Sequence, residues 1–504
     1  MPTPVLVGVD LGTSSVKSVV IAPDGSRLSV AAREVAVDMP RAGWAEQDPE
    51  TWLAATLATL REALQHAGVP PERVAGIGLS GQMHGAVCLD SRGAVLRPAI
   101  IWADQRSAAQ VARVTRELGR ERLGAWTANP LAAGFMLASW LWLREEESDT
   151  ARRTRRLLLP KDYLRYRLTG KLGSEPSDAS STSLFDTTNR RWSRELLDAL
   201  AIEPDLLPPV RGSAEVAGGL TPEAAIQAGL PAGTPVVFGG GDQAMQALGN
   251  GVIDPGILSC TIGTGGQLFA PVTAPVYDPL LRLNHYCHAL PDRWHMQAAI
   301  LSAGLSLRWL RDSVLTGMTY AGLADAAAEV PPGAEGLFFL PCLAGERTPH
   351  MDPAARGAFV GLTLRHGKAH LARAVMEGVV LALRQGLELM LELGAPATRL
   401  VASGGATNHP LWLQLQADIF NRPIYRTRTV EAAACGAAML AGAGLGVYTG
   451  AHDACRQAVR WQEEPVLPGP ERAARYDEAY RTFCRLYPAL AAIGFGTSCE
   501  EAQK

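Results

Sequence analysis

The stretch that decides the fold is VLVGVDLGTSSVKSVVIA, residues 5–22. Its two arms are rich in valine and isoleucine and are separated by Gly-Thr-Ser-Ser, which is typical of a β-hairpin. Asp10 closes the first arm, directly before the turn that carries Thr13 and Ser14. A carboxylate at this position can hold Mg²⁺, and a tight turn offers backbone N–H groups and hydroxyls to phosphate oxygens. A plain hairpin turn with an aspartate at its corner explains the same residues.

A helix and a buried strand follow the hairpin. Asp48 suits an N-cap and Pro49 the first helical position, and large apolar residues repeat at helical spacing as far as His66. The strand is VAGIGLSG, residues 74–81, and it ends at Gln-Met-His. Strands and a helix in this mixed order predict an α/β domain whose functional loops lie at the ends of strands.

The chain length and an internal repeat predict two domains. A single hydrophobic core stops growing near about 250–300 residues, and this chain has 504. TIGTGG at 261–266 matches DLGTSS at 10–15, which indicates a duplicated strand–turn–strand unit. Glycines and a proline cluster just after the middle of the chain. We therefore expect an N-terminal domain at 1–250, a C-terminal domain at 251–487 and a tail at 488–504.

Two segments look like nucleotide-binding motifs but lack the context that such motifs need. Residues 76–81 fit the GxGxxG pattern of dinucleotide-binding proteins, yet they lie within the apolar strand and no helix start follows. Residues 12–18 partly fit a Walker phosphate loop, but the second glycine before Lys17 is missing and a strand follows. We expect neither of these folds, and we expect Lys17 to be a strand residue with its ammonium group in solvent.

Asp242 is the strongest candidate for acid–base chemistry. Three glycines precede it at 239–241, so the backbone can approach a ligand closely where a strand ends. A carboxylate there can accept the proton of an attacking hydroxyl, which is the task of the base in phosphoryl transfer. A glycine-rich loop with a capping aspartate is the structural alternative.

A further glycine-rich strand end is LVASGGATN, residues 400–408. The bare backbone at Gly404 and Gly405 suits a flat ligand such as a purine. Asn408 could equally cap the helix that we predict from Pro410 to Phe420. The residues by themselves leave both interpretations open.

These segments closely resemble the FGGY carbohydrate kinases and, within that family, the xylulokinases. The resemblance runs from Val5 to about Tyr487, with the motifs in the family's order and spacing. The shared segments are DLGTSSVK (10–17), WAEQDP (44–49), GQMHG (81–85), RPAIIWADQR (97–106), LLPKDYLRYRLTG (158–170), GGGDQA (239–244), GTGG (263–266), YCHALPDRWH (286–295), LPCLAGERTPH (340–350), LARAVMEGV (371–379) and SGGATN (403–408).

The resemblance implies an α/β fold of two ribonuclease-H-like domains, of the actin and hexokinase type, with a catalytic cleft between them. It implies ATP and Mg²⁺ as cofactors, with Asp10 as the metal residue and Asp242 as the catalytic base. The implied ATP-binding residues are Asp10, Thr13, Ser14, Gly263, Thr264, Gly265, Gly404, Gly405, Ala406 and Asn408. The implied substrate-binding residues are Gln82, Met83, His84, Trp102, Asp104, Asp242 and Gln243.

The implied reaction is the ATP-dependent phosphorylation of D-xylulose to D-xylulose 5-phosphate. The alternatives are a kinase for another ketose or polyol (ribulose, erythritol or glycerol) and a non-catalytic ATP-binding sensor. Met83 and His84 favour a ketose, because glycerol kinases carry an Arg-Glu pair there and a neutral histidine offers a donor and an acceptor to sugar hydroxyls. Two departures from the family pattern are Gly265, in GTGG where GTSG is usual, and Gln243, where many relatives have asparagine.

Composition limits the partners. A net charge of −3 gives no pull toward nucleic acid or an anionic membrane. The eight cysteines form no CxxC pair, which favours reduced thiols and a cytoplasmic location. Beside the small-molecule ketose and Mg-ATP that the resemblance implies, we therefore expect no nucleic acid and no membrane as partners; a homodimer stays open.

Two further features need a structure to interpret them. The apolar run at 432–447 is dominated by alanine and glycine and is short for a membrane span, so we expect a helix packed closely against another element. The adjacent pair Glu346 and Arg347 fits either an ion pair between the domains or a contact to the substrate.

Overall fold

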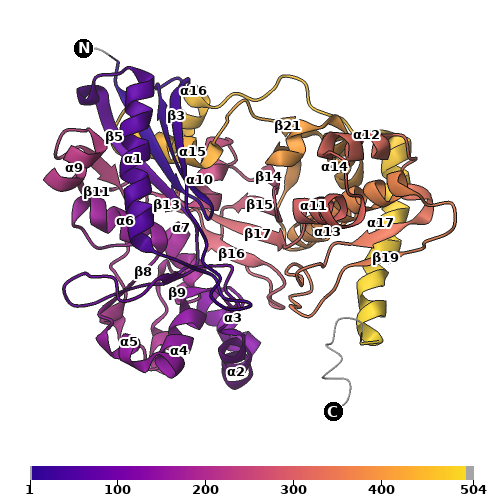
Figure 1. The fold of residues 1–504 in the computed structure, drawn as a ribbon, viewed down its shortest axis with the longest axis horizontal. Coiled ribbons are helices and arrows are strands. Elements are labelled where there is room, and N and C mark those ends of the chain that lie inside the picture. The colour runs from indigo at the N-terminus through magenta and orange to yellow at the C-terminus, as the bar shows by residue number, and fades with distance from the viewer. Residues whose placement is uncertain (1–2, 495–504) are drawn as a thin grey trace.

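The computed structural model describes residues 3–494. The first sheet gathers strands from the N-terminal half of the chain (Figure 1). From edge to edge its strands are β11 (Val216–Gly219), β12 (Pro235–Val237), β5 (Val74–Gly81), β1 (Val5–Leu11), β2 (Ser15–Ile21) and β3 (Arg27–Glu34), and β13 (Gly240–Gly241) also pairs with β5. The helices around it are α1 (Pro49–Ala67), α6 (Pro160–Thr169), α7 (Pro176–Ala179), α9 (Pro222–Ala228) and α10 (Asp242–Gly249).

The hairpin that opens the chain forms as predicted. β1 and β2 are antiparallel, with Asp10 opposite Lys17, and the turn is closed by the N–H of Gly12, which donates to the carbonyl of Ser15 at 3.0 Å. The predicted helix and strand are confirmed as α1 and β5. The carboxylate of Asp48 caps α1 by accepting from the N–H of Glu50 at 3.0 Å.

A smaller layer, formed by β4 before α1 and mostly by the segment between β5 and β11, packs around its own apolar cluster. Its strands are short: β4 (Glu46–Gln47), β6 (Val87–Leu89), β7 (Ala99–Ile100), β8 (Arg156–Leu158), β9 (Phe185–Asp186) and β10 (Arg191–Trp192). Its helices are α2 (Ala108–Leu118), α3 (Arg120–Thr127), α4 (Met136–Glu146), α5 (Ser148–Arg153) and α8 (Arg194–Ala199).

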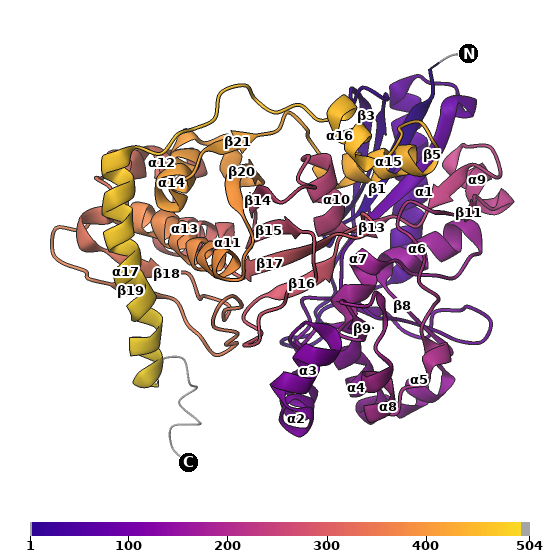
Figure 2. The same ribbon diagram turned by 180° about the vertical axis from the view of Figure 1, so that it is seen from behind.

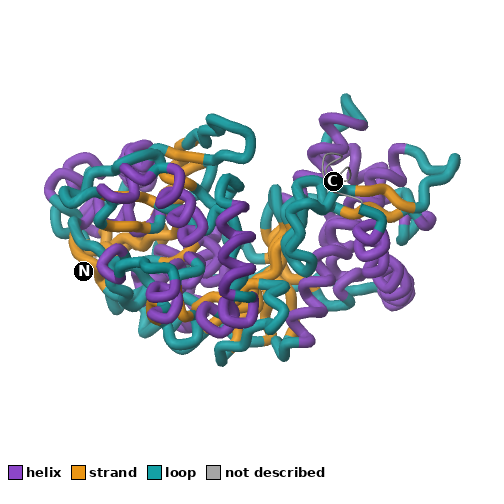
Figure 3. The backbone as a smooth tube through the Cα atoms, turned by 90° about the horizontal axis from the view of Figure 1, so that it is seen from below, coloured by secondary structure: helices purple, strands orange, loops and turns teal. Residues whose placement is uncertain are grey.

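The second sheet repeats the plan of the first. Its order is β16 (Asn284–Cys287), β17 (Trp294–Ile300), β15 (Gly266–Val272), β14 (Gly256–Ile262), β20 (Ala397–Ser403) and β21 (Ile424–Arg426). The hairpin of β14 and β15 has a parallel neighbour in β20, just as the hairpin of β1 and β2 has one in β5. The duplication and the α/β, ribonuclease-H-like fold of two domains are confirmed; Figure 3 shows the two lobes with strands inside and helices around them.

Helices of the second half surround this sheet. They are α11 (Gly304–Trp309), α12 (Tyr320–Ala328), α13 (Lys368–Glu392), α14 (Pro410–Phe420) and α17 (Pro470–Ala492), with a small ribbon of β18 (Phe338–Leu340) and β19 (Ala358–Val360). α14 has the predicted bounds. α17 covers the first residues of the segment 488–504, and residues 495–504 lie outside the described part of the chain. Among residues 3–494, no helix combines the length and apolarity needed to cross a bilayer.

The alanine- and glycine-rich run forms α15 (Ala432–Gly444), which packs on the first sheet beside α16 (Ala451–Ala458) (Figure 2). The contact is close because the strands carry glycines: a Cβ added to Gly8 would lie 1.8 Å from the carbonyl oxygen of Ala434, and one added to Gly78 would lie 1.8 Å from that of Ala437. The predicted close packing is confirmed. The division into domains at residue 250 stays a prediction. α15 belongs to the predicted C-terminal domain by sequence, but it packs on the sheet of the N-terminal half.

Candidate active site

Three neighbouring strand ends bring the candidate residues together. β5 lies between β1 and β13, and both pair with it in parallel. Ser80 of β5 is opposite Asp10 on one side and Gly240 on the other. Asp242 follows β13 and is the first residue of α10, while Gln82, Met83 and His84 follow β5. Because parallel strands end at the same edge of a sheet, these side chains share one rim of the first domain.

Asp10 and Asp242 form a pair of half-buried carboxylates at this rim. Burial raises the pKa of Asp10, and the hydroxyl of Ser80, which donates to the carboxylate at 2.6 Å, opposes the shift. Burial and, to a lesser extent, the negative charge of Asp10 together raise the pKa of Asp242 to about 7, against hydrogen bonds from Gln243. Asp242 is therefore poised to exchange a proton near neutral pH, as a general base must.

His84 is held as a neutral imidazole. Its Nδ1 lies 2.7 Å from the carbonyl oxygen of Ser181, so Nδ1 carries the proton and Nε2 is left as an acceptor. The ring stacks on Phe135 with centroids 3.9 Å apart. Burial lowers the pKa of His84 to about 3, the bond to Ser181 opposes the shift and the positive charge of Arg347 adds to it. Its φ of 75° is strained for a residue other than glycine, and such strain is concentrated at functional sites.

Met83 and Gln243 flank the base. Met83 is buried against the glycine strand, so that a Cβ added to Gly241 would lie 3.0 Å from its Cγ. Gln243 is half-buried and hydrogen-bonds the Asp242 carboxyl. Both therefore border the place that a substrate hydroxyl would occupy beside Asp242.

The Gly-Thr turn after β1 is tied to Trp102 and to the end of β5 by hydrogen bonds. The indole Nε1 of Trp102 donates to Thr13 Oγ1 at 2.8 Å, while Ser14 is exposed. The amide nitrogen of Gln47 donates to the carbonyl oxygens of Thr13 and Ala36 at 2.8 and 3.0 Å. Its oxygen accepts from Gln82 Nε2 at 2.8 Å and from Trp52 Nε1 at 3.2 Å. Sequence reasoning gave Gln47 no role, although it lies in the WAEQDP motif.

Replacing Gln47 by glutamate is expected to loosen this connection. A carboxylate cannot donate, so the carbonyls of Thr13 and Ala36 would lose their buried partner at about 1–3 kcal/mol each. We expect a lower melting temperature and a higher KM for both ATP and sugar, measured by thermal unfolding and steady-state kinetics. The exposed Gln105→Glu variant is the matched control, and unchanged KM values in Gln47→Glu would contradict the role.

The second domain offers the matching pair of loops. Gly263, Thr264 and Gly265 join β14 to β15, and the carbonyl of Thr264 accepts from the N–H of Ala303 and of Leu305 at 3.0 Å. Gly404 and Gly405 follow the adjacent parallel strand β20, and the side chains of Thr261 and Ser403 hydrogen-bond at 2.7 Å between the two strand ends.

The exposure of these loops agrees with contact to a ligand. Gly263, Thr264, Gly404, Gly405 and Asn408 are exposed, whereas Ala406 is buried in the core of the second domain, so only its backbone could face a nucleotide. The alternative role of Asn408 as a helix cap is wrong. His409 caps α14 instead, through Nδ1, which accepts from the N–H of Leu411 at 3.2 Å.

The structure bears on two further expectations. Asp104 is fully buried, and its carboxylate accepts from the N–H of Ala45 at 2.7 Å and binds the guanidinium of Arg106, so its oxygens already have protein partners; its contact with a substrate stays a prediction. Lys17 lies on β2 as predicted, but its ammonium group pairs with Glu431 at 2.7 Å instead of lying free in solvent.

A buried ionic cluster beneath Asp242 was missed. Lys161 Nζ lies 2.9, 3.6 and 3.5 Å from the carboxylates of Asp162, Glu175 and Asp178. Glu175 accepts from Ser177 Oγ at 2.9 Å, and the same hydroxyl accepts from the N–H of Gly241 at 3.0 Å. The cluster thus holds the residue that precedes the base. In the sequence, this cluster is visible only as the adjacent lysine and aspartate of LLPKDYL. Nothing in the spacing of these polar residues indicates that they lie near Asp242.

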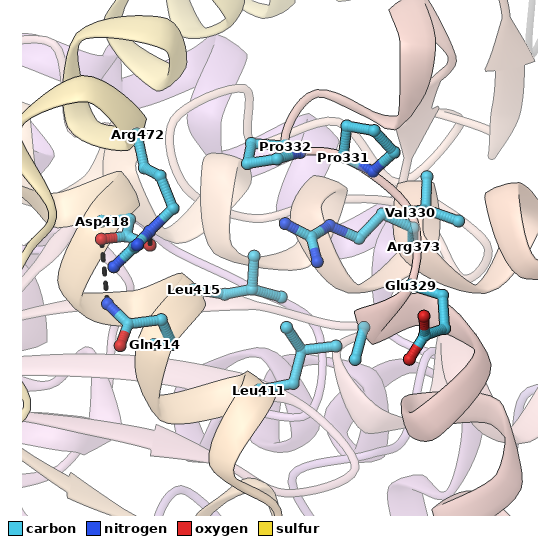
Figure 4. Close-up of a pocket in the computed structure, with 11 residues that line it drawn as sticks. Glu329, Val330, Pro331, Pro332, Arg373, Leu411, Gln414, Leu415, Asp418 and Arg472 are labelled. Carbon is cyan, nitrogen blue, oxygen red and sulfur yellow. Dashed lines mark hydrogen bonds and ion pairs between the residues drawn. The ribbon is translucent and has the colours of Figure 1, made fainter.

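A separate cavity of about 330 Å³ lies in the second domain, between α14 and the loop after α12 (Figure 4). Two of its charged groups, Asp418 and Arg373, already have partners. Asp418 accepts from Gln414 and from Arg472, at 2.9 and 2.6 Å, and Arg373 donates to Glu377 at 2.6 Å. The candidate residues lie elsewhere, so we place the active site at the strand ends.

Comparisons with known proteins agree with this geometry. Models of the FGGY family of carbohydrate kinases match residues 5–249 with the N-terminal domain and 258–445 with the C-terminal domain. The xylulose kinase of Escherichia coli (strain K12) is 37% identical over 486 residues, which cover 96% of this chain and 99% of that protein. The gluconokinase of Bacillus subtilis (strain 168) is 31% identical over 451 residues, 87% of each chain.

Solved structures give the same result. A crystal structure described as a xyloylose kinase from Brucella ovis superposes with a TM-score of 0.90 at 37% identity, and covers 97% of this chain and 100% of that one. Both family models match in order, and the strand ends of the two domains carry the predicted residues. These findings agree on one family. The chain belongs to the FGGY family of carbohydrate kinases and is a carbohydrate kinase.

Proposed function

We propose that this kinase transfers the γ-phosphoryl group of ATP to the C5 hydroxyl of D-xylulose, with Asp242 as the general base. The observation that carries the proposal is the carboxyl of Asp242, whose pKa burial raises to about 7, at the strand end beside Met83 and His84. The relatives named xylulose kinase support the choice of sugar, because they match nearly the whole chain at 34–37% identity.

In the proposed reaction, the carboxylate of Asp242 accepts the proton of the C5 hydroxyl while that oxygen forms its bond to the γ-phosphorus. The bond between the γ-phosphorus and the bridging oxygen of ADP breaks, and ADP leaves. Nε2 of neutral His84 accepts from another sugar hydroxyl and so orients the chain of the sugar. Backbone N–H groups of the turns at Gly12 and Gly263 are placed to stabilise phosphate charge.

The residues at the rim fit a magnesium ion. Mg²⁺ favours one or two carboxylates together with water and substrate phosphates. Asp10 uses one carboxylate oxygen to accept from Ser80, and the negative charge of Asp10 raises the pKa of Asp242, a repulsion that a cation would relieve. Asp10 would hold the ion, which when bound would neutralise phosphate charge. ATP would place its phosphates at the two Gly-Thr turns and its adenosine at Gly404, Gly405 and Asn408.

The experiment that tests the sugar is a comparison of ADP release with D-xylulose, D- and L-ribulose, glycerol, erythritol and gluconate. We expect the highest kcat/KM with D-xylulose. A higher value for another compound would replace D-xylulose as the substrate. ATP binding with no sugar-dependent ADP release would favour a non-catalytic sensor.

The pH dependence of the reaction follows from the base. Asp242 must be ionised to accept a proton, and its pKa of about 7 lies above that of an ordinary aspartate. We expect kcat/KM for the sugar, measured with saturating Mg-ATP, to fall about tenfold per pH unit below the pKa of Asp242 and to level off above it. Because a bound cation relieves the repulsion from Asp10, this break should lie between the ordinary pKa of an aspartate and about 7. A profile that stays flat down to the ordinary pKa of an aspartate would contradict this assignment.

A further inference from the structure

Arg347 reaches from the second domain to the sugar side of the site. It lies in the loop between β18 and β19, and its guanidinium carbon is 5.8 Å from the ring centroid of Phe135, the residue that stacks on His84. Its positive charge adds to the lowering of the pKa of His84 by burial, and it opposes the raising of the pKa of Tyr286 by burial. Arg347 therefore lies beside both rings.

The guanidinium of Arg347 has no hydrogen-bond or ion-pair partner within residues 3–494. Its neighbour Glu346 is turned away: that carboxyl accepts from the N–H of Arg347 and of Leu301, at 2.8 and 3.3 Å. Burial raises the pKa of Glu346 to about 8, against these bonds, so it is largely neutral at pH 7. The structure therefore does not contain the ion pair that was one expectation for Glu346 and Arg347. Other buried arginines, such as Arg106 and Arg165, bind carboxylates.

An arginine in such surroundings is a donor without an acceptor. Burial lowers the pKa of Arg347, against the nearby Tyr286 and Glu346, which shows that the cation has given up part of its hydration. A guanidinium only donates hydrogen bonds, and its desolvation is compensated when an acceptor group binds it. Arg347 is half-buried, so the oxygen of a ligand in the site can supply the acceptor in place of water.

The position of Arg347 indicates which part of a sugar it would meet. Met83 packs on Gly241, the residue before the base, with its Cγ 3.0 Å from an added Cβ there. On the other side, His84 stacks on Phe135 at 3.9 Å, and Arg347 lies 5.8 Å from that same ring. Arg347 thus lies on the His84 side of the site and not on the Gly241 side. If the C5 hydroxyl of a 2-ketopentose lies at Asp242, the opposite end of the sugar carries the ketone oxygen, which only accepts hydrogen bonds.

We propose that Arg347 donates to the C2 ketone oxygen of the sugar and thereby selects ketoses over the corresponding polyols. The proposal rests on the proposed function, since it takes the C5 hydroxyl as the group beside Asp242. A planar guanidinium matches the in-plane lone pairs of a carbonyl, while a hydroxyl at the same carbon is tetrahedral and brings a hydrogen atom of its own.

The test compares Arg347→Met with the wild type on D-xylulose and on xylitol, the pentitol that has a hydroxyl at C2. We expect KM for D-xylulose to rise about 10- to 100-fold, as for loss of a hydrogen bond to a charged group. KM for ATP and the sugar-independent hydrolysis of ATP should stay within about twofold, because Arg347 contacts neither phosphate loop. The preference for ketose over pentitol should fall by the same factor as KM rises.

Two further variants keep the result interpretable. Arg347→Lys retains a donor and should recover part of the ketose preference. Both variants should melt near the wild-type temperature, because the guanidinium has no hydrogen bond or ion pair within residues 3–494 to lose and its contact with the Phe135 ring is long, at 5.8 Å. Arg365→Met removes an exposed arginine of the same domain and should change nothing. An unchanged preference in Arg347→Met would overturn the proposal, as would a larger loss with gluconate, which would assign Arg347 to a carboxylate.

The outcomes separate this proposal from the proposed function. If the wild type prefers another 2-ketopentose, D-xylulose is wrong, and the same loss of ketose preference in Arg347→Met with that sugar still supports the contact. If the wild type phosphorylates polyols as well as every ketose, the contact to the ketone is overturned.

Discussion

Replacing Asp242 by asparagine is expected to lower kcat about 10²- to 10⁴-fold, the range typical for loss of a general base. Asparagine keeps the size of the side chain but cannot accept the proton of the sugar hydroxyl at neutral pH. The measurement is sugar-dependent ADP release at saturating ATP and sugar. KM for ATP should change little, because the phosphate turns at Thr13 and Thr264 are left intact.

The stability of this variant distinguishes catalysis from folding. The pKa of Asp242 is raised in the folded state, so its contribution to stability is complete below the ordinary pKa of an aspartate and is lost as the pH rises through about 7. Asp242→Asn should therefore be at least as stable as the wild type at pH 8, by thermal unfolding. The exposed Asp292→Asn variant is the control, and near-normal turnover in Asp242→Asn would remove Asp242 as the base.

The elements that carry the site could be predicted because their signals are local. Alternating β-branched residues, the Gly-Thr turn and the cap of α1 at Asp48 are decided by neighbours in sequence, and all of them are confirmed. The duplicated turn at 261–266 was equally visible, and the second hairpin that it predicts is confirmed as β14 and β15. Local rules also fixed α14 from Pro410, although the cap proved to be His409, the residue directly before the proline, instead of Asn408.

The contacts that complete the site could not be predicted, because they join residues far apart in sequence. Nothing near Gln47 shows that its amide would bridge Thr13 and Gln82, and Asp104 lay within a plausible motif until its partner Arg106 was seen. The same holds for the place of Arg347 beside His84, which depends on how the two domains meet. Resemblance to a family identifies motifs, but the pairing of buried polar groups decides which of them are free to bind a ligand.

Changing Gly78 to alanine is expected to destabilise the protein severely. Gly78 lies on β5, the central strand that leads to Met83 and His84, and its added Cβ would lie 1.8 Å from the carbonyl oxygen and 2.4 Å from the carbonyl carbon of Ala437. Both obstacles are backbone atoms of α15, so no side chain can rotate away. The helix would have to move off the sheet, at a cost of at least about 3 kcal/mol, the upper part of the range for overpacked cores.

The measurement is the melting temperature and the yield of soluble Gly78→Ala. The matched control is Gly367→Ala, an exposed glycine with no atom within 4 Å of an added Cβ and a backbone conformation open to alanine. We expect a clear loss for Gly78→Ala and almost none for the control. A melting temperature within about 2 °C of the wild type would mean that α15 can shift on the sheet with almost no loss of folding free energy. The close contacts at the glycines would then not be what holds this helix in place. In sequence α15 lies between β21 and α17 of the second domain, yet it packs on the first sheet, so the same glycine contacts join the C-terminal half of the chain to the sheet that carries Asp10 and leads to Met83 and His84.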